Sequence, residues 1–194
     1  MSRESLTAAQ RRWYEVLFLV FGLVGVALIG VAAYRTNLER AHFVVPRVWP
    51  TYVPDAFVIN SKLAVNVDLK NVGKSPAANI QDWRHTYIQG DGSLTSQEDV
   101  VESFKKWIAT NPSIGGNTVQ SGEVFWVTAQ GDILSPEDRQ NIMSGRRAVY
   151  VLVNMHFTDD FGGHEYHFCQ FLSPPQGGGG TMIWNFCSPY NDEH

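Results

Sequence analysis

The 194-residue chain contains few residues of the kinds that mark common chemical sites. Its only cysteines, Cys169 and Cys187, are too few for a disulfide-built scaffold and do not have the paired spacing of zinc ligands. Neither a G-x-S-x-G elbow nor an H-E-x-x-H pair occurs. Beyond residue 35 there is no basic stripe, and 11 Lys and Arg face 17 Asp and Glu, a formal charge near −6. This balance argues against nucleic acid and an anionic lipid surface as partners of that part.

One long apolar run is present near the N-terminus. Residues 16–33 read VLFLVFGLVGVALIGVAA, without a charged residue. As a helix the run spans roughly 27 Å, close to the hydrocarbon core of a bilayer. We therefore expect a transmembrane helix over residues 16–34, with the lipid bilayer as its partner. A cleavable signal peptide is the alternative, because Val31-Ala32-Ala33 could serve as a cleavage site, although the apolar core is longer than usual.

The residues around and inside this run are typical of a membrane anchor. Aromatic rings suited to the headgroup level stand at both ends, and glycines inside it permit, without requiring, close approach of another helix. These residues are Trp13, Tyr14, Gly22, Gly25, Gly30 and Tyr34. Three arginines lie on each side of the run, so the charge balance favours an orientation only weakly. We expect a cytoplasmic tail over residues 1–15 and the C-terminal part outside.

Residues 35–54 are predicted to form a proline-containing stalk. Prolines break a helix and favour an extended chain. The stretch contains Pro46, Pro50 and Pro54 together with apolar residues such as Phe43 and Trp49. We expect part of it to lie along the following domain as an edge strand.

The rest of the chain, residues 55–194, is predicted to be one β-rich domain. Apolar residues alternate with polar ones, a period of two that indicates half-buried strands. The predicted strands cover residues 63–70, 77–88, 124–127, 148–158, 164–172 and 181–187. Short strands separated by polar turns favour a β-sandwich.

Two short helices interrupt these strands. Thr95 and Glu98 read as a capping box before an apolar helical face that runs from Val100 to Ile108. A second helix is predicted from Ser135, with a proline at its first position and Asp138 as the reciprocal cap. The segment 110–116 between the first helix and the next strand is expected to be a loop.

Two segments carry a resemblance to a known group of proteins. Residues 71–77, Asn-Val-Gly-Lys-Ser-Pro-Ala, resemble an N-x-G-x-[S/T]-P-A turn, and residues 157–162 with Phe168-Cys169 resemble a second hairpin. Both are similar to uncharacterised bacterial single-pass membrane proteins in which one N-terminal helix carries a small extracytoplasmic domain. The resemblance implies an immunoglobulin-like β-sandwich with one or two inserted helices and a periplasmic domain anchored in the inner membrane. That group has no established activity, so no catalytic residue is transferred.

The two cysteines could pair with one another in an oxidising compartment. If residues 176–180 form the loop of a hairpin, Cys169 faces Cys187 directly. A loop one residue shorter or longer shifts this match, so the sequence leaves the disulfide open.

The remaining candidates for chemistry are histidines near one hairpin, His156, His164 and His167, with Asp159 beside them. If Asp159 pairs with His164, then His156 faces His167, and two imidazoles with a carboxylate could hold a divalent metal. The alternative is a polar outer sheet face with solvated histidines.

No paired catalytic residues emerge from these patterns, so we expect neither catalytic activity nor a cofactor. The predicted function is a membrane-anchored extracytoplasmic binding or assembly module, or an accessory subunit of a membrane complex, with a protein partner in the membrane or the periplasm. A metal-dependent hydrolytic enzyme that uses His156, His164 and His167 is the alternative.

Overall fold

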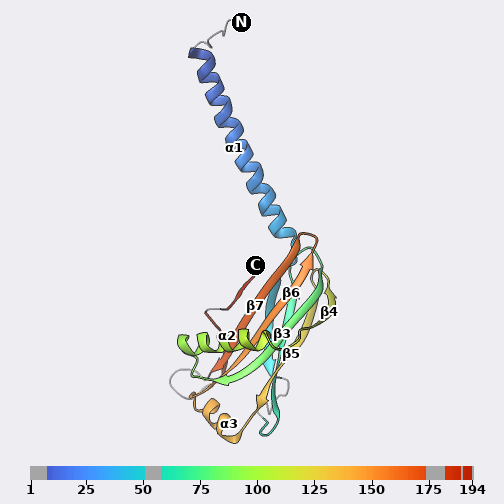
Figure 1. Ribbon diagram of the computed structural model, residues 1–194, viewed down its shortest axis with the longest axis vertical. Helices are drawn as coiled ribbons and strands as arrows, with labels where there is room; N and C mark the ends of the chain where they lie inside the picture. The colour runs from blue at the N-terminus through green and yellow to red at the C-terminus, as the bar shows by residue number, and fades with distance from the viewer. Residues whose placement is uncertain (1–7, 51–57, 174–181, 189, 194) are drawn as a thin grey trace. The chain divides into compact units, whose positions relative to one another are not determined.

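The computed structural model describes residues 8–50, 58–173, 182–188 and 190–193. The chain divides into two compact units, Met1–Arg40 and Ala41–His194. Within these described ranges, the first unit contains one helix, and the second contains the strands and two further helices (Figure 1).

The helix of the first unit, α1, spans Ala8–Glu39 and includes the predicted helix over residues 16–34. Among the described residues, the segment Arg12–Thr36 is the one helix long and apolar enough to cross a membrane, and none of its most apolar window is buried. Trp13, Tyr14 and Tyr34 are exposed, and the glycines at 22, 25 and 30 have open space where a Cβ would lie. The side chains singled out in the sequence therefore lie on the surface of an apolar helix.

Among the described residues, nine strands form the β-rich part of the second unit. They are β1 (Phe43–Pro50), β2 (Lys62–Asn71), β3 (Ala77–Gln89), β4 (Ile114–Val119), β5 (Val124–Ile133), β6 (Ala148–Asp159), β7 (Gly162–Ser173), β8 (Ile183–Phe186) and β9 (Asp192–Glu193). Their order in the sheet is β1-β2-β5-β3-β6-β7-β8, with β4 paired to β3 and β9 to β7. The prediction of a mainly β fold is confirmed. The described strands form one continuous curled sheet, which does not confirm an immunoglobulin-like sandwich of two sheets.

The predicted stalk over residues 35–54 is divided between the two units. Residues 35–39 continue α1, and residues 43–50 form β1, which pairs antiparallel with β2 at one edge of the sheet. Part of the segment is thus an edge strand, as expected, and Pro54 lies outside the described residues.

The two other helices are α2 (Leu94–Ile108) and α3 (Pro136–Met143). The cap of α3 is the predicted one, with Ser135 and Asp138 bonded reciprocally. The predicted cap of α2 at Thr95 is wrong, because Ser93 accepts the bond from the Ser96 backbone N–H. Ser93 holds the extended conformation that an N-cap requires, whereas Thr95 already lies in the first helical turn.

The turn after β2 is organised by the fully buried side chain of Asn71. Its Oδ1 accepts the backbone N–H groups of His42 (3.1 Å) and Gly73 (3.0 Å). Its Nδ2 donates to the carbonyls of Ser75 (2.8 Å) and Val119 (3.3 Å). The asparagine of the N-x-G-x-S-P segment therefore ties three parts of the fold together, and its role in this chain is structural.

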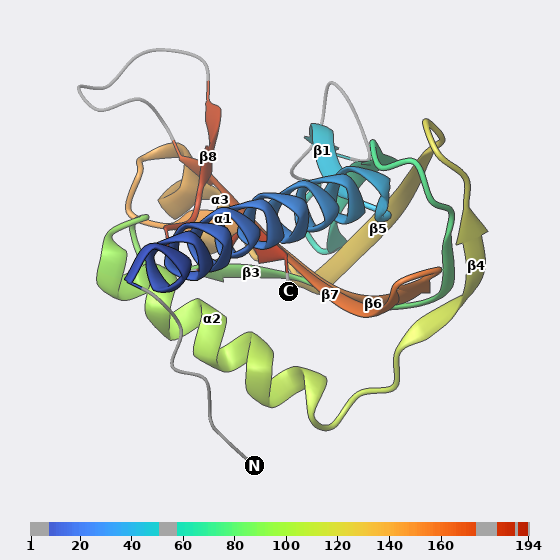
Figure 2. The ribbon, with the colours of Figure 1, turned by 90° about the horizontal axis from the view of Figure 1, so that it is seen from above.

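The core lies on both faces of the central strands. Strand β6 is buried on both, because α2 covers one face while β5, β2 and β1 curl over the other (Figure 2). The inner layer includes Val67, Val127, Val151 and Phe157. The layer under α2 consists of Val100, Val101, Phe104, Ala148, Tyr150, Leu152, Cys169, Phe171, Cys187 and Tyr190.

A disulfide joins Cys169 of β7 to Cys187, with the two Cα atoms 5.4 Å apart. The pairing of Gln170 with Phe186 and of Ser173 with Ile183 brings the two cysteines opposite each other. The loop predicted over residues 176–180 lies outside the described residues.

Candidate functional site

An opening in the sheet arises because β3 has two different neighbours along one edge. Its first half, Ala77–Asp82, pairs with β4, whereas β5 joins it in parallel only at His85 and Thr86. At this junction a Cβ on Gly131 would lie 2.2 Å from the carbonyl oxygen of Thr86, so the close approach requires a glycine. The earlier part of β5 leaves β3 and follows β2.

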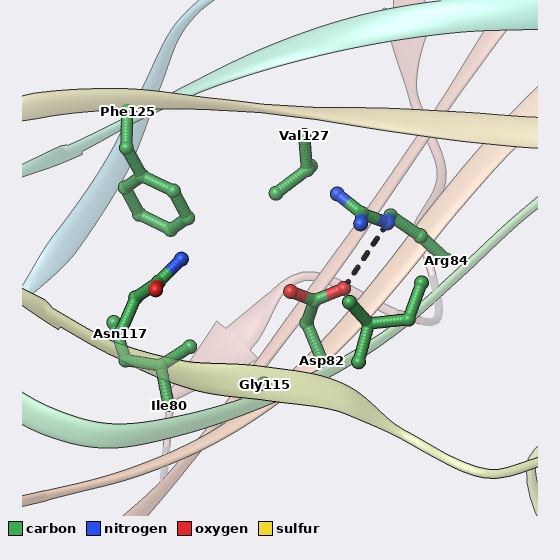
Figure 3. Close-up of a pocket in the computed structure, with 8 residues that line it drawn as sticks. Ile80, Asp82, Arg84, Gly115, Asn117, Phe125 and Val127 are labelled. Atoms are coloured by element: carbon green, nitrogen blue, oxygen red, sulfur yellow. Dashed lines mark ion pairs between the residues drawn. The ribbon is translucent and has the colours of Figure 1, made fainter.

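A pocket of about 70 Å³ lies between these strands (Figure 3). It is lined by Ile80, Asp82 and Arg84 of β3, Ile114, Gly115 and Asn117 of β4, and Phe125 and Val127 of β5. One water molecule takes up roughly 30 Å³ in the liquid, so the pocket admits about two waters or one short side chain. The site is therefore suited to a small group.

The pocket contains a buried ion pair. Arg84 Nε lies 3.2 Å from Asp82 Oδ1, and the Asp82 side chain is 8 % exposed. The pair lacks hydrogen-bond geometry, so these two atoms have no hydrogen-bond partner among the described residues. Buried polar atoms are nearly always hydrogen-bonded, and leaving one unsatisfied costs roughly 1–3 kcal/mol. Because these two atoms are buried against each other, the second carboxylate oxygen of Asp82 and the other guanidinium nitrogens of Arg84 are the polar atoms left for a group that enters the pocket (Figure 3).

Burial raises the pKa of the Asp82 carboxyl, and the positive charge of Arg84 opposes that rise. An uncharged group that has both a hydrogen-bond donor and an acceptor could bond Asp82 and Arg84 without bringing a third charge into the pocket. The Asn117 amide offers a donor and an acceptor of its own (Figure 3). The chemistry of the pocket therefore matches a carboxamide or a hydroxyl.

The histidines predicted as candidates lie elsewhere, on the β6–β7 hairpin. The condition for His156 to face His167, a cross-strand pairing of Asp159 with His164, is not met, because Asp159 pairs with Gly162 across a two-residue loop. His156 consequently faces Glu165, and His167 faces Asn154. The prediction centred the turn one residue too late, which shifts every cross-strand pair that depends on it.

His156 and His167 both contact the same carboxylate oxygen of Glu165. Glu165 Oε1 lies 3.0 Å from His156 Nε2 and 2.9 Å from His167 Nε2, and it accepts a 2.9 Å bond from Asn154 Nδ2. Desolvation acts to raise the pKa of Glu165, but the bonds from His167, Asn154 and His156 outweigh it and lower the pKa to about 2. The carboxylate is thus held ionised by its own neighbours.

The third histidine forms a separate pair, in which His164 Nε2 lies 2.8 Å from Asp159 Oδ1. The predicted metal ligands therefore do not converge on one point. His164 contacts Asp159, whereas His156 and His167 both contact Glu165. Among the described residues, no group of three or more His, Cys, Asp or Glu is arranged to hold a metal ion.

Sequence reasoning missed the ion pair of the pocket. In β3, residues 80, 82, 84 and 86 share one face and Trp83, His85 and Tyr87 share the other. The aromatic face has the stronger apolar signal, and it packs toward α2. Charged side chains at 82 and 84 therefore look solvent-facing, and the alternation alone does not reveal that a second layer covers them.

No protein-family model, curated protein or solved structure matches this chain. Membership of the bacterial group remains a prediction that rests on the turn at Asn71 and the hairpin after Phe157. Function has to follow from the geometry of the chain itself.

Proposed function

We propose that this protein is a single-pass membrane protein whose β-rich unit is a non-enzymatic binding or assembly module. Helix α1 supports the anchor, since its segment Arg12–Thr36 has the length and apolarity to cross a bilayer. The proposed orientation puts the N-terminus in the cytoplasm and the β-rich unit on the periplasmic side of a bacterial inner membrane. The disulfide between Cys169 and Cys187 supports an oxidising compartment.

The observation that carries the binding function is the Asp82–Arg84 pair in the pocket. Replacing a buried ion pair by apolar residues is often neutral or stabilising, so stability alone does not favour charges at these two positions. Their side chains line a space that admits a small polar group, and one atom of each has no hydrogen-bond partner among the described residues. Binding such a group accounts for both features.

The lining of the pocket supports binding over catalysis. A covalent mechanism requires a nucleophile beside a base, or an activated lysine. None of the residues that line the pocket is a Ser, Thr, Cys, Lys or His, and its one acid lies beside its own counter-ion. A recognition role needs only the donors and acceptors that these side chains provide.

Site-specific photocrosslinking in intact membranes tests the binding function. The photoreactive residue p-benzoylphenylalanine replaces the exposed Trp126, which lies between the pocket residues Phe125 and Val127, and, as a matched control, the exposed Glu137 of α3. We expect one defined crosslinked product from position 126 only, and its loss in the double variant Asp82→Leu/Arg84→Met. No product, or the same product from both positions, would contradict the proposal.

Carbonate extraction of the membranes tests the anchor separately. The full chain should stay in the membrane pellet, because the apolar helix is more stable in lipid than in water. Release into the soluble fraction would show that α1 does not span the bilayer.

A further inference from the structure

Strand β5 has one unpaired edge along most of its length. It pairs with β2 without interruption from Val124 opposite Lys70 to Gln130 opposite Ala64. On its other side it reaches β3 only at Gln130 and Gly131. Within the described part of the chain, the edge from Val124 to Ala129 therefore has no strand partner. Such an edge presents backbone N–H and C=O groups that another extended chain can pair with.

This edge lacks the features that usually prevent pairing. Residues 124–129 read VFWVTA, with no charge and no proline, and their register against β2 is regular. Proteins commonly protect an edge with lysine, proline or a bulge. The other strand at the opening, β4, does have such protection, because its pairing with β3 shifts register twice. The β5 edge is therefore the one suited to accept a strand.

Both faces of this edge favour a strand of alternating character. Inward, Phe125 and Val127 line the pocket with the Asp82–Arg84 pair (Figure 3). Outward, Val124 is 51 % exposed and Trp126 is 66 % exposed, a large apolar surface for a sheet face. Alternate side chains of an added strand would point into the pocket and over Trp126.

We propose that β5 binds an extended segment of a partner protein by strand addition along residues 124–129. One short amide or hydroxyl side chain of that segment enters the pocket and bonds Asp82, Arg84 and Asn117. Its outward side chains are apolar and cover Trp126. The segment is uncharged at the pocket position, because a further charge beside the balanced ion pair would be costly to desolvate. This inference rests on the proposed binding function and names the kind of partner.

A defined peptide tests the inference on the full chain in detergent micelles. The probe is a blocked hexapeptide in which valines alternate with threonines and one central threonine is replaced by asparagine. We expect it to slow amide hydrogen exchange within residues 124–129 and to leave exchange in α2 unchanged. Asn117→Ala should weaken peptide binding about tenfold, as should glutamate in place of the asparagine of the peptide, since each removes about one good hydrogen bond or adds a charge.

Asn141→Ala on α3 is the matched control, because Asn141 does not line the pocket, and it should leave peptide binding unchanged. Absence of slowed exchange at 124–129, or slowing only at β1 or β8, would overturn strand addition. Equal affinity of the Asn117→Ala variant would overturn the role of the pocket. If the peptide fails while position 126 still gives its specific crosslink, the binding module stands and strand addition is wrong. If both fail, both proposals are wrong.

Discussion

The two faces of the central strands are covered in different ways. Under α2, the Gln97 side chain donates to the Gly92 carbonyl and accepts the Ser188 backbone N–H, each at 2.8 Å. On the inner face, the Asp82–Arg84 pair lines a pocket between β3, β4 and β5. The first face is covered by a helix, whereas the inner face has an opening. The difference separates a helix-covered part of the core from a part that contains a pocket.

The largest loss of stability should come from a cavity in the core under α2. Phe104 of α2 is fully buried, so Phe104→Ala is expected to cost about 3–5 kcal/mol of unfolding free energy. Denaturant unfolding of the full chain in detergent measures it. The matched change at the opening, Val124→Ala, removes an exposed side chain and should stay within about 0.5 kcal/mol. Equal costs would contradict the division between the two faces.

Breaking the ion pair from one side should cost somewhat less. Arg84→Met leaves Asp82 buried without its counter-ion, and we expect a loss of about 3 kcal/mol. The double variant Asp82→Leu/Arg84→Met should recover that stability, because two apolar side chains can be buried here without the desolvation cost of two charged ones. A double-mutant cycle of unfolding free energies measures the coupling. A double variant as unstable as Arg84→Met would mean that the pair is needed for folding.

Removing the satisfied polar group under α2 should have a moderate effect. Gln97→Ala leaves the Gly92 carbonyl and the Ser188 N–H without their partner, which is expected to cost roughly 1–3 kcal/mol. The exposed Glu98→Ala on the same helix is the control for helix propensity. If the two variants unfold at the same denaturant concentration, the Gln97 bonds contribute nothing measurable.

The smallest effect should be the pH dependence that Glu165 contributes. Its pKa is lowered to about 2, so the folded state gains stability from its ionised form. This gain is present above the unfolded pKa of about 4.3 and is lost as the pH falls toward 2. Because Glu165 is partly exposed, solvent screening limits it to about 1 kcal/mol. Unfolding of wild type and Glu165→Gln should therefore differ more at pH 7 than near pH 2.

Asp82 should act in the opposite sense. Burial raises its pKa, so its contribution to stability is fully present below the unfolded pKa and decreases as the pH rises through the folded pKa. Comparison of wild type with Asp82→Asn over the same pH range should show a slope opposite in sign to that of Glu165→Gln. If the two slopes of stability against pH had the same sign, the contrast between the buried Asp82 and the partly exposed Glu165 would be wrong.

Local signals predicted the elements well and their pairing poorly. The alternation in β2, β3 and β6 and the cap of α3 depend on residues close in sequence, so they could be read directly. The glycines at 115 and 116 indicated a loop, although β4 begins at Ile114 because β3 offers it a partner. The pocket depends on where β5 leaves β3, a contact between distant segments. No pattern within β3 or β5 alone encodes that separation.

Asp159 has a mechanical consequence if helix α1 anchors the protein in a membrane, as proposed. Its Oδ2 accepts the backbone N–H of Ala41 (2.8 Å), and its Oδ1 accepts N–H groups from Phe161 and Gly162 of the hairpin turn. Tension pulled along the chain through residue 40 would thus be transferred to the β6–β7 hairpin at Ala41. Charge-assisted bonds of this kind are stronger than neutral ones. The hairpin would bear the load before β1 could be peeled from the margin of the sheet.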